Sequence, residues 1–465
     1  MAISPRVPRD LDRERGRPLR TDGGDSAVSE EPETDAPDGR ETTTERAGDA
    51  TSSSADGDHW LRQYARDHVA HGLVVAVFAL YPFIYSSMAG LPRVDLMVAT
   101  VDFGAFFDAF MPAMTFVIAM LFLGLFAMSF DFISGYTGYL SFGHAAFYGV
   151  GAYTIILIAN GDVPVLPAET PFVVTMVLGG LLAFALALAI GLVSFRLTGV
   201  YFAMITLGVA QVIYELVRNW DYVAANPQEG PTHQGSTPEI GIPFVDSLSV
   251  SIGRLAGTEF ENVLGLGIDL SATEVSYWAI GLIVLLCYFA MQRIIHSPFG
   301  RVMIAIRENE ERARAIGYNV FWYKMVAFGF SGFFAGIAGA LFAGFRGNAS
   351  PDETFYFLHT ADALIVTIVG GIGTLAGPLF GSVFFEWLED ILSSEQGGLA
   401  PFLRDLVGES IVINSVIDGR APLYLGIVFV LFVLFVPNGL LGSVRDRIGG
   451  TVSKQLPSVL DRYRR

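Results

Sequence analysis

The sequence predicts an all-α, polytopic membrane protein with about eight transmembrane helices, a re-entrant or broken helix pair and one amphipathic helix on the inner side. Three observations lead to this fold class. Hydrophobic residues make up 52% of the 465 residues, and the mean hydropathy is +0.49. They gather in runs without Lys, Arg or Glu at 73–83, 116–130, 173–195 and 424–436. One further hydrophobic segment, 361–393, is interrupted by glycines, which disfavour a helix interior.

The long apolar segments define the expected spans, because about 20 helical residues cross a hydrocarbon core. In chain order these spans are about 69–89, 110–131, 141–159, 172–195, 199–218, 275–293, 325–345 and 421–437. The interrupted segment precedes the last of them.

Both ends of the chain differ from this apolar middle. Residues 1–58 hold 15 acidic residues against 8 arginines and few large apolar side chains, so we expect a disordered acidic cytoplasmic tail. We expect a transmembrane domain at 59–442 and a basic cytoplasmic tail at 443–465. The net charge is −17, yet the lysines are limited to Lys324 and Lys454. This balance is typical of a halophile-like protein that keeps a strongly hydrated surface in concentrated salt.

Basic residues in short loops indicate which side each loop faces. They flank the first and last spans and fill the loop 294–324, so we place that loop and both termini in the cytoplasm. The loop 219–274 has Arg254 as its single basic residue and is expected outside. Parity then requires 361–393 to enter and return on the same face, or to cross twice. The glycine-rich stretch 370–378 is the natural reversal point.

Two glycine-rich interruptions share the spacing G-x-x-G-x-L, at 135–140 and at 370–375. Broken apolar segments in corresponding halves of a chain point to a transport site near the bilayer midplane. The alternative is that small residues merely allow helices to cross closely. That simpler explanation is the one we favour for the small residues of the seventh span, Gly332, Gly336, Ala340 and Gly344.

The loop 294–324 predicts one amphipathic helix. Ser297-Pro298 reads as an N-cap followed by a first-turn proline, and Gly317 as the stop, about 28 Å further on. An apolar stripe is expected at Val302, Ala305, Ile306, Asn309, Ala313 and Ile316, with the ion pairs Glu308–Arg312 and Glu310–Arg314. Such a helix can lie on lipid, pack on its own protein or dock in a partner's groove. Its mixed charges favour a protein partner over lipid.

Several blocks of the chain resemble known permeases. The string 311–317, E-R-A-x-x-x-G, resembles the coupling loop by which ABC-importer permeases engage their ATPase subunits. The blocks 135–153, 197–207, 297–310 and 370–378 resemble, in order, those of the branched-chain amino acid permease family. The resemblance runs from about 69 to 442. Asp131 stands where Asn is common in the family, and Tyr139 where Gln is common.

The resemblance implies a membrane permease subunit of an ABC importer for branched-chain amino acids, in the plasma membrane. It implies as partners a second permease subunit, two ATP-binding subunits, an extracellular substrate-binding protein and membrane lipid, but no nucleic acid. No Gly-Lys dipeptide occurs, so the chain has no P-loop; we expect no bound cofactor, and ATP use by the partners. The chain also has neither G-x-S-x-G nor H-E-x-x-H, which argues against an enzyme. A urea or short-amide permease and an ion-coupled secondary transporter remain alternatives.

Two groups of candidate site residues follow. The expected substrate pathway comprises Asp131, Gly135, Gly138, Ser141, His144, Thr206, Gly371 and Gly373. The expected ATPase-coupling residues are Arg301, Arg307, Glu308, Glu311, Arg312, Ala313 and Gly317. Structural roles compete with the first assignment: Ser141 as a cap, His144 as a packed and hydrogen-bonded ring, and Thr206 bonding its own helix.

Overall fold

The computed structural model describes residues 79–85, 94–96, 99–101, 111–168, 170–232, 239–241, 249–251, 272–392, 421–436, 439–440 and 442–443. The chain divides into two compact units, 1–70 and 71–465, and every described residue belongs to the second. The predicted acidic tail, and all but one residue of the basic tail, lie outside the described residues.

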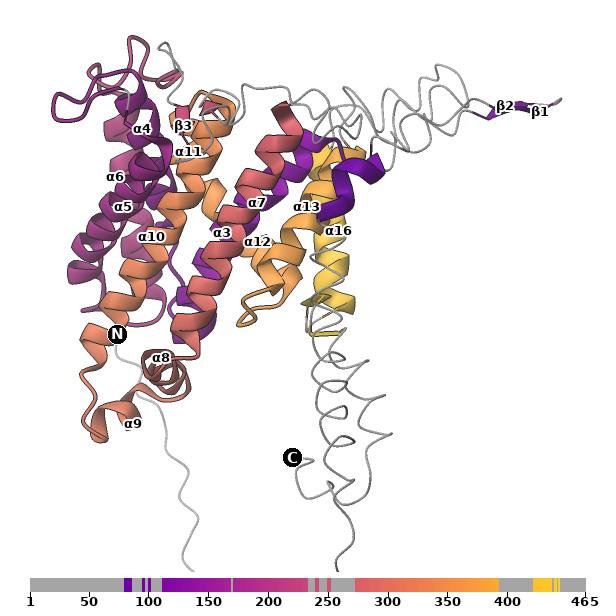
Figure 1. The fold of residues 1–465 in the computed structure, drawn as a ribbon. Helices are drawn as coiled ribbons and strands as arrows, with labels where there is room; N and C mark the ends of the chain where they lie inside the picture. Colours follow the sequence, from indigo (N-terminus) through magenta and orange to yellow (C-terminus); the bar gives the residue numbers. More distant parts are fainter. Residues whose placement is uncertain are drawn as a thin grey trace, which may run out of the picture. The chain divides into compact units, whose positions relative to one another are not determined.

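Five helices are long and apolar enough to cross a membrane: α3 (Met114–Thr137), α5 (Phe172–Ser194), α6 (Val200–Arg218), α7 (Ala272–Ile295) and α10 (Val320–Arg346) (Figure 1). The shorter ones are α4 (His144–Ala159), α8 (Pro298–Glu308), α9 (Glu310–Ala315), α11 (Pro351–Thr354), α12 (Phe357–Gly370), α13 (Gly377–Leu392) and α16 (Ala421–Phe435). Every predicted span from the second to the eighth is therefore a helix. Of the first span, 79–85 is helical, and the rest lies outside the described residues.

The described residues also contain four strands of three residues each, which the all-α prediction did not include. β1 (Val94–Leu96) pairs antiparallel with β2 (Ala99–Val101), with Asp95 opposite Thr100. β3 (Glu239–Gly241) pairs antiparallel with β4 (Ser249–Ser251), with Ile240 opposite Val250. Each is a two-stranded ladder between helices, so the fold remains helical.

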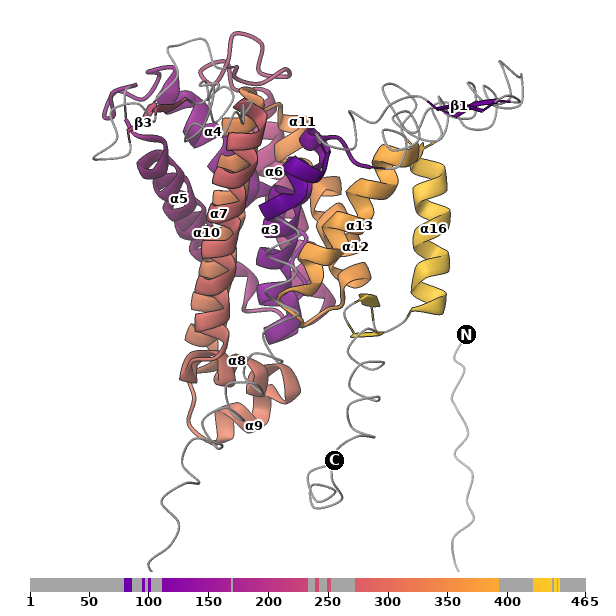
Figure 2. The same ribbon diagram turned by 45° about the vertical axis from the view of Figure 1, so that its right-hand side comes forward.

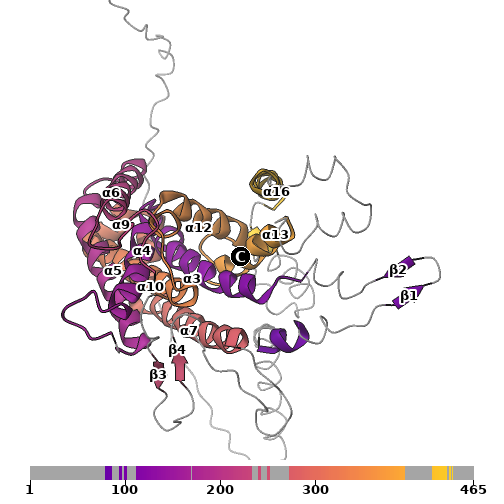
Figure 3. The same cartoon turned by 90° about the horizontal axis from the view of Figure 1, so that it is seen from above.

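α3 and α10 form the centre of the bundle. Their most apolar windows are 89% and 83% buried, against 33–39% for α5, α6 and α7, whose outer faces expose leucine and valine side chains. Seen along the bundle, α3 lies between α10 and the α12–α13 pair (Figure 3). A helix that is apolar on all sides and exposed on one of them is suited to lipid contact.

Small residues let α10 approach its neighbours closely. A Cβ on Gly336 would lie 2.6 Å from the Cβ of Ala183 in α5, and one on Gly339 would overlap the carbonyl oxygen of Tyr148 in α4. Gly332 and Gly344 are equally crowded, against Ala187 and Phe172. The prediction that these glycines permit close helix crossing is confirmed.

The connecting segments gather at two ends of the bundle (Figure 2). At one end Asn160 Nδ2 donates to the Thr232 carbonyl at 2.8 Å, and Ala349 N donates to the Pro231 carbonyl at 3.1 Å. The segments 138–143 and 195–199, together with α8 and α9, lie at the other end, which we call the α8 end. α12 runs toward the α8 end, and α13 returns beside it. With 14 and 16 residues these helices are about 21 and 24 Å long, shorter than a hydrocarbon core. The α12–α13 hairpin thus starts and finishes at the same end of the bundle, which both alternatives of the parity argument, re-entry and a double crossing, require.

Candidate functional site

The two G-x-x-G-x-L interruptions meet at the α8 end of α3. The backbone N–H of Gly373 donates to Asp131 Oδ1 at 2.8 Å, and that of Leu375 donates to the hydroxyl of Tyr136 at 3.1 Å. A Cβ placed on Gly135 would lie 2.7 Å from Gly373 N, so only glycine fits there. The last two turns of α3 and the loop 371–376 therefore form one unit, although some 240 residues separate them along the chain.

α8 and α9 replace the single amphipathic helix that the sequence predicts, and that prediction is wrong. Ser297 caps α8, accepting a 3.4 Å hydrogen bond from Gly300 N, with Pro298 in the first turn as expected. At Asn309 the backbone leaves the helical region, with φ −163° and ψ 103°. Its side-chain Oδ1 instead accepts a 2.8 Å hydrogen bond from Arg312 N and starts α9. An asparagine that caps a new helix interrupts the preceding one.

This break changes the predicted stripe and ion pairs. Val302, Ile306 and Ala313 are buried, and they form a small cluster with Val320 of α10. Ala305, Asn309 and Ile316 are exposed, Ile316 at 71%, so their assignment to the apolar stripe is wrong. Arg314 pairs with Glu310 at 3.0 Å as predicted. The Glu308–Arg312 pair does not form, because the break lies between its members.

Arg307, at the end of α8, is exposed as a whole, but its guanidinium reaches the end of α3. One of its guanidinium nitrogens donates a hydrogen bond to the carbonyl of Gly135, in the last turn of α3. The same nitrogen lies 2.9 Å from where a Cβ on Gly373 would be. A side chain expected to face a partner protein thus touches both glycine interruptions.

Glu310, at the start of α9, makes a second connection. Its carboxylate accepts hydrogen bonds from Tyr139 Oη at 2.7 Å and from Lys324 Nζ at 3.0 Å. Partial burial alone raises the pKa of Glu310. The hydrogen bonds from Tyr139 and Lys324, with the charges of Lys324 and Arg314, outweigh it and hold this pKa below its usual value. Glu310 is therefore an ionised anchor at neutral pH.

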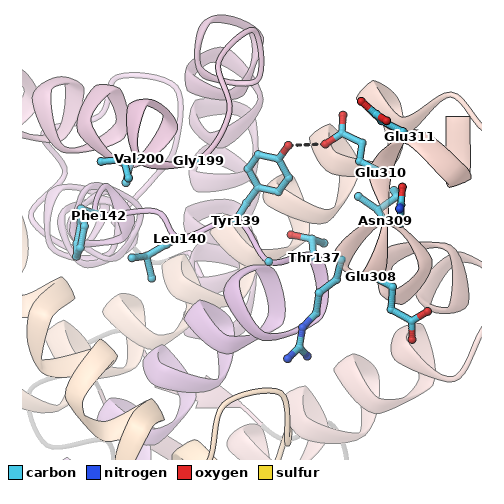
Figure 4. Close-up of a pocket in the computed structure, with 14 residues that line it drawn as sticks. Thr137, Tyr139, Leu140, Phe142, Gly199, Val200, Glu308, Asn309, Glu310 and Glu311 are labelled. Carbon is cyan, nitrogen blue, oxygen red and sulfur yellow. Dashed lines mark hydrogen bonds between the residues drawn. The ribbon is translucent and has the colours of Figure 1, made fainter. Parts of the chain in front are cut away.

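A pocket of about 690 Å³ lies among these groups (Figure 4). Its walls come from the α3–α4 break, the first turn of α6 and the α8–α9 junction. Figure 4 shows the Tyr139 ring directed at Glu310, while the Glu308 and Glu311 side chains point away from it. The lining residues are Thr137–Leu140, Phe142, Gly199, Val200, Ala203 and Ile306–Glu311.

The predicted pathway residue His144 is fully buried in a hydrogen-bond relay. Its Nε2 lies 2.6 Å from Ser331 Oγ, and Ser331 donates to the Ser129 carbonyl at 2.6 Å. Because that hydroxyl proton is committed to Ser129, Nε2 of the ring must be the donor. Phe130 and Phe147 pack edge-on against the ring at 5.3 and 5.4 Å.

Ser141 and Thr206 are also buried and bonded. Ser141 Oγ accepts from Gly143 N at 3.3 Å, just before α4 begins. Thr206 Oγ1 donates to the Ala203 carbonyl at 2.9 Å and accepts from Phe142 N at 3.2 Å, tying α6 to the α3–α4 break. Neither residue, nor His144, lines the pocket. Their geometry matches the structural roles that competed with the pathway assignment, and as pathway residues they stay predictions.

Several polar residues of the bundle were not singled out from the sequence. Tyr139 was noted only as a departure from a family pattern, and Lys324 only as one of two lysines. α13 carries Glu386, Glu389 and Asp390 at helical spacing, half-buried, and the first two are close enough to Asp362 of α12 to interact electrostatically. That spacing was the available signal, since carboxylates at membrane depth are costly.

Comparisons with known proteins agree with this arrangement. Residues 113–435 match the family described as branched-chain amino acid transport system, permease component. The high-affinity branched-chain amino acid transport system permease proteins LivM of Salmonella typhimurium and Escherichia coli are each 29% identical over 338 residues, covering 72% of this chain and 70% of theirs. The ribose import permease protein RbsC of Escherichia coli is 24% identical over 178 residues, 37% of this chain and 54% of its own. No solved structure gives a significant match.

Proposed function

The chain belongs to the family of branched-chain amino acid transport permease components, and we propose that it is the membrane subunit of an ABC importer for branched-chain amino acids. The observation that carries the proposal is the extent of the family match, residues 113–435. It includes all five long apolar helices, both glycine interruptions and the α8–α9 segment. The family and the apolar helices make the chain a membrane transport protein.

In this proposal, α8 and α9 are the segment through which ATP hydrolysis by the partner subunits acts on the helix bundle. Six charged residues of mixed sign are exposed there: Arg301, Arg307, Glu308, Glu311, Arg312 and Arg314. Beside them Ile316 is 71% exposed and Trp322 57% exposed, so apolar surface accompanies the charges. Ala313 is buried against α10 and would hold the segment to the bundle, while Gly317, with φ +102°, turns the chain back toward α10. A mixed surface of this kind favours a protein partner, and in this proposal two ATP-binding subunits supply it.

The remaining partners follow from the two ends of the bundle. With the α8 end in the cytoplasm, segment 219–232 faces outward, where an extracellular binding protein would deliver the substrate. A second permease subunit would complete the transport path, and lipid would cover the exposed faces of α5 and α6. We place the path beside Asp131, Gly135, Gly138, Gly371 and Gly373, because backbone outside a helix at membrane depth is tolerated only when buried in protein or lining a cavity.

The test is transport by the complex of this chain with its ATP-binding, permease and substrate-binding subunits, reconstituted in proteoliposomes. We expect uptake of labelled leucine that requires ATP and is competed by isoleucine and valine. Competition by urea or acetamide alone would assign the chain to a short-amide permease. Uptake by the chain alone, without ATP, would instead establish a secondary transporter.

A variant pair tests the docking surface. Glu311→Lys, on the exposed side of α9, is expected to lower co-purification of the ATP-binding subunits and ATP-dependent uptake together. Glu229→Lys, also exposed but at the opposite end of the bundle, is the matched control for charge reversal and is compared for retention of the ATP-binding subunits alone. Equal retention of the ATP-binding subunits by the two variants would contradict the assignment.

A further inference from the structure

The Arg307 side chain contacts three glycines that belong to both interruptions. It donates to the Gly135 carbonyl, its Cγ lies 3.4 Å from where a Cβ on Gly138 would be, and its Nη1 lies 2.9 Å from where one on Gly373 would be. Gly138 and Gly373 also have positive φ, +78° and +79°. Gly373 therefore leaves space that the guanidinium occupies, which gives it a role beyond the turn itself, while a Cβ on Gly138 would meet the Arg307 Cγ at ordinary contact distance.

The electrostatics of this position favour a cation. α3 ends at Thr137, and its last carbonyls, including that of Gly135, have no partners within the helix. α12 ends at Gly370, beside the same loop. The C-terminal ends of two helices, each with partial negative charge, thus converge near Arg307. Asp131 adds a carboxylate close enough to interact electrostatically with Arg307.

The α8–α9 junction is hydrogen-bonded to the bundle on both sides of the helix break at Asn309. Arg307 precedes Asn309 and holds Gly135, while Glu310 follows Asn309 and holds Tyr139. The two partners lie on either side of the Gly138 turn. Because both attachments are charge-assisted hydrogen bonds, a displacement of α8–α9 must move the end of α3 with it.

The loop 371–376 is also attached to the last two turns of α3. Besides its own turns and its bonds to the adjoining helices α12 and α13, the described loop is hydrogen-bonded through Gly373 to Asp131 and through Leu375 to Tyr136. Both partners lie in the last two turns of α3. Resting on the proposed function, we infer that Arg307 is a positioning residue for transport: it holds this loop against the end of α3 and shifts the loop when α8–α9 move.

The test uses the complete complex in proteoliposomes and two measurements on each variant: leucine molecules moved per ATP hydrolysed, and thiol labelling at the loop. Ile372, 48% exposed, is changed to cysteine as the reporter, while the native Cys287 is buried. For Arg307→Ala we expect ATP hydrolysis to persist, leucine moved per ATP to fall about tenfold, as for loss of a charge-assisted hydrogen bond, and the nucleotide-dependent change in labelling to disappear. Arg307→Lys keeps the charge without the planar fork and should be intermediate.

Arg293→Ala, an exposed arginine in the last turn of α7, is the matched control and should behave as the parent. An unchanged ratio of leucine to ATP together with unchanged nucleotide-dependent labelling in Arg307→Ala overturns the inference. If that variant does not assemble, the same two measurements on Arg307→Lys decide. ATP-independent uptake by the parent complex would refute the proposed function instead, so the two failures are distinguishable.

Discussion

The ammonium nitrogen of Lys324 lies 3.0 Å from Oε1 of Glu310, and this ion pair joins the first turns of α10 to α9. The Lys324 side chain is only 4% exposed. It is also the only lysine in the part of the chain that the structure describes, in a protein that otherwise uses arginine. Its nitrogen donates to Tyr139 Oη at 2.8 Å and lies 4.5 Å from the centre of that ring. A compact ammonium can satisfy three such neighbours at once, whereas a planar guanidinium requires more room.

Replacing Lys324 with arginine should therefore destabilise the protein. We expect a loss of about 1–3 kcal/mol, as for other insertions of extra volume into a packed site. Thermal or denaturant unfolding of the purified protein in detergent measures it. The exposed Arg293→Lys should stay within about 0.5 kcal/mol of the parent. Equal stability of Lys324→Arg and the parent would show that the site does not select lysine.

The contribution of Glu310 should depend on pH in one direction. Its pKa in the folded protein lies below the ordinary value of 4.5, so ionised Glu310 stabilises the fold above that value, and the contribution is lost as pH falls through the lowered pKa. The difference in unfolding free energy between the parent and Glu310→Gln should thus be constant at neutral pH and shrink only in acid, below 4.5. A difference that already shrinks near neutral pH contradicts the assignment.

Asn309 should be needed to start α9. Asn309→Ala removes the side-chain acceptor for Arg312 N and should cost about 1 kcal/mol, whereas Asn309→Asp keeps an acceptor and should cost little. Hydrogen exchange of the amides of 310–315 reports α9 directly and should accelerate only in the alanine variant. Equal exchange in both variants would mean that packing of Ala313, rather than the cap, holds α9.

Close packing of α10 on α5 predicts opposite outcomes for two glycines. Gly336→Ala would place a methyl group 2.6 Å from the Ala183 Cβ, so we expect a loss of about 1–3 kcal/mol and weaker assembly. At Gly208, within α6, an added methyl group would meet no atom within 4 Å apart from the neighbouring residues and backbone of its own helix. Gly208→Ala should therefore be neutral or gain up to about 1 kcal/mol from helix propensity. Unfolding curves of the two variants make the comparison, and similar effects in both would contradict it.

His144→Ala should lower uptake while the complex still assembles, and the structure adds a second effect. Removal of the ring leaves a cavity among Phe130, Phe147 and Phe328 and takes a donor away from Ser331, so the unfolding temperature should also fall. Uptake is measured per assembled complex, which separates the two effects. Unchanged uptake per complex would remove His144 from the transport pathway and leave it a structural role.

The sequence by itself was sufficient for the second to eighth spans and for the hairpin at 361–393. Apolar runs of membrane length, arginine-rich loops and a glycine-rich reversal are local signals, and a membrane allows few other arrangements for them. It also located Gly135 and Gly373 as members of two similar breaks. It could not show that these two glycines touch, because that contact depends on how α3 packs beside the α12–α13 hairpin.

The tertiary structure alone decided where the polar side chains point. Helical periodicity treated 297–317 as one helix, because a pattern of apolar spacing does not register the capping bond from Asn309 to Arg312 N. The same periodicity predicts that Arg307 faces a partner protein. In the folded chain, packing also brings the ends of α3 and α12 to its guanidinium. Sequence patterns report neighbours three or four residues apart, but Arg307 bonds Gly135, Glu310 bonds Tyr139 and His144 bonds Ser331, each across more than 170 residues of the chain. Only the packing of whole helices brings such residues together.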